Sequence, residues 1–142
     1  MALLKSKKYL GNTPSFPIQE WGVIMTARNF EELQVWQKAH RMVLNIYKIT
    51  KLFPEEEKFG LISQIRRSGV SICANIAEGY KKSTKDFIRF LEISEGSLEE
   101  TKYHLILSQD LEYCTSSQFK ELYERAEEVG KMLNGLITKL RL

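Results

Sequence analysis

Proline and cysteine are scarce in this sequence, and it contains no long hydrophobic run. Only three prolines occur among 142 residues, which favours long helices. The two cysteines, Cys73 and Cys114, form no Cys-x-x-Cys pair, so they are typical of neutral thiols in a reducing compartment and not of a disulfide framework or metal site. No apolar run reaches the roughly 20 residues of a membrane span, and the start lacks the apolar core of a secretory signal. We expect a cytoplasmic all-α protein with no membrane partner.

Recognisable catalytic motifs are also missing. A di-iron bundle needs glutamate three residues before histidine, but Gln37 precedes His40 and Thr101 precedes His104 at that spacing. The sequence has no phosphate-binding loop, no Gly-x-Ser-x-Gly and no His-Glu-x-x-His. Neither histidine closely follows an arginine, as in some helical-bundle ribonucleases. These observations predict a protein that is not an enzyme and that needs no metal or cofactor.

Charge is distributed very unevenly along the chain. Residues 58–89 carry a net charge of +5, whereas residues 90–142 carry −4. Residues 1–29 add +3 and residues 30–57 add −1. This separation indicates either an anionic partner or head-to-tail contact between subunits.

Apolar periodicity predicts an antiparallel up-down four-helix bundle over residues 29–142. Asn29, Ser83 and Thr115 are expected to cap helices, Pro54 to open the second helix and Gly79 to mark its end. The expected helices are 30–51, 54–80, 83–113 and 115–140. In the first of them the predicted inward stripe is Phe30, Leu33, Trp36, Val43 with Leu44, and Tyr47.

Residues 1–28 differ from the rest of the chain. The stretch "GNTPSFPIQEWG" contains two prolines and no helical period, which is typical of a flexible arm. In the alternative interpretation, translation starts at Met25, because the codons for Trp-Gly force a guanine run that resembles a ribosome-binding site just upstream. Both interpretations remain open from the sequence.

The stretch "SQIRRSGVSICANIAEGYKKS" is unusual for a helix because small residues and glycines replace better helix formers. Gly69 falls within a core seam, where we expect a neighbouring helix to come very close. A second row is polar but nearly uncharged, which predicts partial burial between helices or between subunits. Its members are Gln64, Ser68, Ser71, Asn75 and Glu78.

The two adjacent arginines point about 100° apart on a helix, so they should differ in role. Arg67 lies beside the polar row and is predicted to pair with Glu78 or another carboxylate. Arg66 lies on a more apolar row and is predicted to contact phosphate. The predicted nucleic-acid-binding residues are Arg66, Lys81, Lys82, Lys85 and Arg89. The predicted structural or oligomer-interface residues are Gln64, Arg67, Ser71, Asn75 and Glu78.

The segments "FEELQVWQKAH", "LFPEEEKFGLISQIRRSGVSICANIAEG" and "FIRFLEISEGSLEET" resemble the 23S rRNA intervening-sequence proteins, over residues 29 to 141. These small bacterial proteins are similar to the accessory proteins of diversity-generating retroelements, which form basic homopentameric barrels. The resemblance implies a non-enzymatic, nucleic-acid-associated homopentamer. The sequence departs from the family pattern at Cys73, usually proline, and at Glu95, usually basic.

Two functions follow as hypotheses. The first is an oligomer that binds structured RNA, such as rRNA, or another nucleic acid through phosphate contacts. The second is a protein-interaction scaffold or accessory subunit that makes no nucleic-acid contact. Salt dependence distinguishes them, because phosphate binding weakens steeply with salt and a packed protein interface does not.

Overall fold

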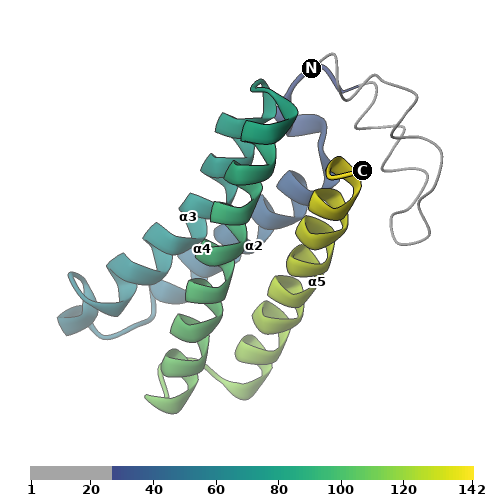
Figure 1. Cartoon of the computed structure of the whole chain (residues 1–142). Coiled ribbons are helices and arrows are strands. Elements are labelled where there is room, and N and C mark those ends of the chain that lie inside the picture. The colour runs from purple at the N-terminus through teal and green to yellow at the C-terminus, as the bar shows by residue number, and fades with distance from the viewer. Residues whose placement is uncertain (1–26) are drawn as a thin grey trace.

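The computed structural model describes residues 27–142. Both interpretations of the arm concern residues 1–28, and almost all of that segment lies outside the described residues. The described chain is all-α, as predicted, with four helices packed as an up-down bundle (Figure 1). Two short 3₁₀ helices precede α2 and α3. In chain order the elements are η3 (Phe30–Glu32), α2 (Gln34–Thr50), η4 (Glu55–Glu57), α3 (Leu61–Tyr80), α4 (Thr84–Asp110) and α5 (Ser116–Leu140).

Each helix packs against the next helix in the chain, and α5 closes the bundle by packing against α2. The centre is filled by aliphatic side chains from all four helices, which bury apolar surface. It includes Ile46, Ile65, Ile72, Leu91, Leu98, Leu105, Val129 and Leu133. Because neighbouring helices run antiparallel, the start of α2, the α3–α4 turn and the C-terminus lie at one end of the bundle (Figure 1). Within residues 27–142, no helix is both long and apolar enough to cross a membrane.

The first two helices begin later than predicted. Asn29 is a cap, but its side chain accepts from the Glu31 N–H at 3.0 Å and so caps η3, not α2. Pro54 likewise precedes η4, and α3 begins only at Leu61. The carboxylate of Glu57 accepts from the Leu61 N–H at 2.8 Å and so satisfies one free donor of the first turn of α3.

The caps predicted for the last two helices are confirmed. The Ser83 hydroxyl accepts from the Asp86 N–H at 3.2 Å at the start of α4. Thr115 and Gln118 form a reciprocal capping box at the start of α5, with distances of 3.1 and 2.9 Å. Both helices therefore start where their local sequence dictates.

Gly79, and not Gly69, is the position where two helices come very close. A Cβ on Gly79 would lie 2.6 Å from the Phe90 Cβ on α4, which is closer than real carbon contacts. A Cβ on Gly69 would lie 3.5 Å from Ile46 Cδ1, an ordinary van der Waals distance. The helix ends at Tyr80, next to Gly79, as predicted, but Gly79 does not have a positive φ, so this end is not a left-handed glycine cap. Its missing side chain instead makes room for Phe90.

Candidate nucleic-acid interface

Four of the predicted nucleic-acid-binding residues gather at the α3–α4 turn. Lys81, Lys82, Lys85 and Arg89, here called the cationic tip, are all exposed. None of them forms an ion pair with any carboxylate of residues 27–142. The Lys82 Nζ and the Arg89 guanidinium lie 5.6 and 5.7 Å from the centre of the Phe90 ring. The tip is therefore a small exposed surface with an excess of positive charge, because its four cations outnumber the neighbouring carboxylates of Glu78 and Asp86.

Arg66 lies far from the cationic tip. It precedes Lys81 by 15 residues on one helix, which corresponds to about 22 Å along the axis. Its Nε donates to Thr50 Oγ1 at 2.9 Å and its Nη2 to the Tyr47 carbonyl at 3.4 Å. The guanidinium also lies 4.5 Å from the centre of the Tyr47 ring. Arg66 is thus half-buried and binds the last turn of α2, where free carbonyls favour a cation.

Within a single chain, the contacts of the two arginines differ from those predicted, while a carboxylate of another subunit for Arg67 and a phosphate for Arg66 stay predictions. Arg67 is exposed and forms no ion pair or hydrogen bond with a described residue, whereas Arg66 is held in place. The apolar row that carries Arg66 faces the end of α2. That row therefore indicated packing and not a free surface.

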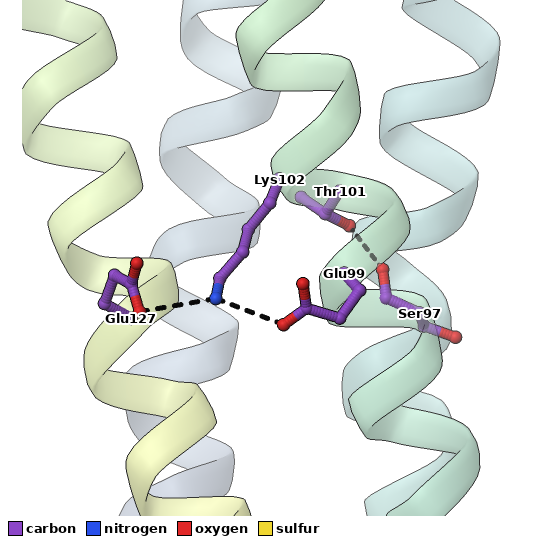
Figure 2. A network of polar contacts seen from close by, with 5 residues as sticks. All are labelled: Ser97, Glu99, Thr101, Lys102 and Glu127. Atoms are coloured by element: carbon purple, nitrogen blue, oxygen red, sulfur yellow. Dashed lines mark hydrogen bonds and ion pairs between the residues drawn. The ribbon is translucent and has the colours of Figure 1, made fainter.

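The polar row of α3 is partly buried between helices, one of the two predicted alternatives. The Ser71 Oγ lies 2.8 Å from the Ser97 Oγ of α4, and Ser68 lies 2.8 Å from Thr101 Oγ1. On α4 the Thr101 hydroxyl also donates to the Ser97 carbonyl at 2.9 Å (Figure 2). Small hydroxyl side chains therefore let α3 and α4 pack closely while satisfying one another.

The other members of the row do not cross to α4. The Asn75 amide donates to the Ser71 carbonyl at 2.8 Å and to its Oγ at 3.0 Å, so it binds its own helix. Gln64 and Glu78 are exposed. Burial of the row is thus confined to its centre.

Ion pairs join the acidic surfaces of α4 and α5. The Lys102 Nζ lies 3.1 Å from Glu99 Oε1 and 3.4 Å from Glu127 Oε2 (Figure 2). Burial lowers the pKa of Lys102, but the two carboxylates outweigh it and hold the pKa above its ordinary value. Two further pairs, Lys38–Glu128 and Arg141–Glu92, join α2 to α5 and α5 to α4. These pairs are structural and leave the cationic tip unpaired.

An apolar groove of about 500 Å³ runs between α2 and α3. Four of the six stripe residues predicted to face the core line this groove and are not buried, because α2 buries Ala39, Met42, Val43 and Ile46. They are Phe30, Trp36, Leu44 and Tyr47. The Trp36 and His40 rings stack in it with centres 4.8 Å apart. The groove is defined here by Trp36, His40, Leu44, Tyr47, Val70 and Ala74.

Comparison with known proteins identifies the family. A family model described as "23S rRNA-intervening sequence protein" matches residues 31–135. The chain belongs to this family. Its fold also matches a crystal structure from Bacteroides thetaiotaomicron, described as a protein of unknown function from the S23 ribosomal protein family. That match has 34% sequence identity and a TM-score of 0.68 and covers 73% of this chain and 95% of the other. No curated protein matches the chain.

The family match covers both the cationic tip and the groove of this 23S rRNA-intervening sequence protein. The two departures from the family pattern lie on different helices. Cys73 borders the groove, and burial raises the pKa of its thiol to about 12, so it is neutral as predicted. Burial also raises the pKa of the Cys114 thiol. Burial and the nearby carboxylate of Glu92 raise the pKa of Glu95.

Within residues 27–142, no cluster of three His, Cys, Asp or Glu side chains is placed to hold a metal ion.

A buried histidine in this family member was not anticipated. His104 is 9% exposed, and neither ring nitrogen has a hydrogen-bond partner among residues 27–142. Burial lowers the pKa of His104, although the nearby Glu100 carboxylate opposes this effect. The folded state therefore favours the neutral ring.

We expect the stability of the fold to decrease as the pH falls below the ordinary histidine pKa of 6.5. In that range the unfolded state binds a proton that the folded state resists, so acid favours unfolding. Melting temperatures of the parent and of His104→Leu at pH of about 7.5 and about 5.5 measure this. The parent should lose more stability on acidification than the variant. Equal losses would contradict the assignment.

Proposed function

We propose that this chain is a non-enzymatic, cytoplasmic nucleic-acid-binding protein that works without a cofactor. Its ligand is structured RNA, with rRNA the favoured class. It binds as a homo-oligomer, with five copies taken from the resemblance to the retroelement accessory proteins. The observation that carries the proposal is the cationic tip, where four exposed cations have no carboxylate partner among residues 27–142. Phosphate oxygens are the ligands that such a surface recognises.

An oligomer would strengthen binding through the cationic tip. With one tip per copy, the charges of several tips would act together on one RNA.

The aromatic side chains near the tip favour structured RNA over single strands. Single-strand binding uses exposed aromatic faces on which bases stack. Tyr80 and Phe87 are each 1% exposed, so neither offers such a face. Phe90 is half-buried and is flanked by Lys82 and Arg89. Contact with the phosphate backbone of a folded RNA remains the mode that these residues suit.

The proposal is tested by replacing two tip lysines. We expect the double variant Lys81→Ala, Lys85→Ala to bind a labelled rRNA hairpin more weakly than the parent. Its slope of log K against log salt should be smaller by about two, because each lost phosphate contact removes about one released counterion. Binding measured across a potassium chloride series gives both quantities.

The matched control replaces two exposed lysines of α5, Lys120 and Lys131, with alanine. It makes the same change in net charge away from the tip and should bind like the parent. An equal loss in both double variants would show that net charge alone matters. A parent that fails to bind the hairpin at low salt would defeat the proposal.

The second candidate function is a protein-interaction scaffold, and the apolar groove between α2 and α3 favours it. An amphipathic helix is the kind of partner that such grooves accept. Binding that persists at high salt would support this function over RNA binding.

A further inference from the structure

We propose that the groove between α2 and α3 of one copy receives the outer face of α4 from the next copy. This face is defined by Ile93, Gly96, Glu100 and Tyr103. The inference rests on the homo-oligomer of the proposed function and names the two surfaces that would build it.

Large apolar side chains on both sides of the groove are exposed to solvent in the single chain. Leu44 is 56% exposed and Val70 is 43% exposed, and they lie on opposite sides of it. Contiguous apolar patches of this kind mark interaction sites. Arg41 and Arg67 are exposed beside these two residues on their helices. The groove therefore has an apolar floor and basic margins.

The outer face of α4 has the complementary character. Its four residues follow one another at steps of three and four, so they form one row along the helix. Ile93 is 46% exposed and Tyr103 is 58% exposed. Glu100, a member of the row, and the adjacent Glu99, which is paired with Lys102, are exposed between them. A row that combines apolar side chains with an acidic residue fits a groove with basic margins.

The presence of glycine at position 96 is the reason for choosing the outer face of α4 as the surface that enters the groove. It lies in the middle of a 27-residue helix, where glycine costs about 1 kcal/mol relative to alanine. A Cβ at this position would meet nothing within 4 Å, and its φ is not positive, so nothing within residues 27–142 requires glycine here. Close approach of a surface from another copy would supply the missing reason.

The groove and the α4 face lie on different parts of the bundle, since α4 packs between α3 and α5. A contact between them is heterologous, and heterologous contacts that close generate rings. Groove-to-groove pairing is disfavoured because it would bring basic margins together. The proposed contact thus explains how identical chains could form a closed assembly.

Cysteine cross-linking tests the pairing in a Cys73→Ala, Cys114→Ser background. Both native thiols are removed, because Cys73 borders the groove and Cys114 is only partly buried. Leu44→Cys chains and Ile93→Cys chains, which keep Gly96, are oxidised separately and then as a mixture. We expect a disulfide-linked dimer only in the mixture, and a ladder of linked chains when both cysteines are on one chain. Cross-linking of Leu44→Cys alone would indicate groove-to-groove pairing and overturn the inference.

Light scattering on Gly96→Arg separates this inference from the oligomer itself. The variant should fold, because the new side chain points into open space in the single chain, and its helical circular dichroism checks this. We expect its mass to fall to that of a monomer, while the parent is an oligomer at micromolar concentration. If Gly96→Arg is still an oligomer, the proposed pair of surfaces is wrong, whereas the homo-oligomer of the proposed function is not contradicted. A monomeric parent would overturn both.

Discussion

Gly79→Ala is expected to destabilise the bundle by roughly 1–3 kcal/mol or more. The added methyl group would lie 2.6 Å from the Phe90 Cβ and 3.1 Å from Phe87 Cδ1. The Phe90 Cβ is fixed to the backbone of α4, so rotation of a side chain cannot relieve the contact. The turn between α3 and α4 would have to open, which would disturb the start of α4 and the cationic tip. Urea unfolding of the parent and the variant measures the loss.

Gly69→Ala is the matched control on the same helix. Its Cβ would make ordinary contacts with Ile46 and Val43, at 3.5 and 3.6 Å, so alanine fits without movement. Alanine is also the better helix former, and we expect a gain of up to about 1 kcal/mol. The two substitutions should therefore change stability in opposite directions. A loss at Gly69 or a neutral result at Gly79 would contradict the packing described.

Arg66→Ala is expected to destabilise the fold by about 1–2 kcal/mol. The variant loses both hydrogen bonds to the last turn of α2 and the contact with the Tyr47 ring. It also leaves the buried Thr50 hydroxyl without its Arg66 donor. Thermal and urea unfolding measure the effect, and RNA binding at a temperature where the variant is folded should keep the parent's salt slope.

Arg67→Ala is the natural control, because it removes the same charge one residue away. Arg67 is exposed and has no partner among residues 27–142, so the free energy of unfolding should change by less than about 0.5 kcal/mol. The sequence pattern favours the opposite outcome for the two arginines. Both arginine variants are compared in the Gly96→Arg background, where the proposed contact of Arg67 with the α4 face of another copy is absent. Greater destabilisation by Arg67→Ala there would contradict the contacts described within the chain.

The parts of the fold that the sequence predicted correctly depend on local interactions. Ser83 and Thr115 cap helices through groups three residues away, so their spacing is sufficient evidence. Asn29 and Pro54 carry similar signals, but each begins a short 3₁₀ helix before the α-helix. A capping residue predicts where the first helical turn begins, but it does not predict whether that turn ends as a short 3₁₀ helix or continues as an α-helix.

The stripe predicted for the first helix was correct for only two of its six residues, for a different reason. Two adjacent apolar rows lie on this helix, and periodicity alone does not say which one meets the other helices. Leu33 and Val43 are buried in the core, whereas Phe30, Trp36, Leu44 and Tyr47 line the groove. The sequence could have shown this, because the apolar residues of α2 cover a wider part of the helix surface than one buried face requires.

The candidate site likewise has some features that the local sequence predicts and others that depend on how the helices pack. The cationic tip was predictable because its residues are close in sequence across one turn. The separation of Arg66 from the tip follows from its distance along α3, and its contact with Thr50 depends on how α2 packs. Neither the burial of His104 nor the open space around Gly96 can be read from neighbouring residues.

The connections between the helices span only residues 51–60, 81–83 and 111–115, and most helix contacts join neighbours in the chain. Chains with such local contacts reach the native state quickly, on timescales from microseconds to milliseconds, because little loop entropy is lost before contacts form. The contact between α2 and α5 is the exception, since it joins the two ends of the described chain. We expect it to form last, so that breaking the Lys38–Glu128 pair would speed unfolding and leave the folding rate nearly unchanged in stopped-flow measurements.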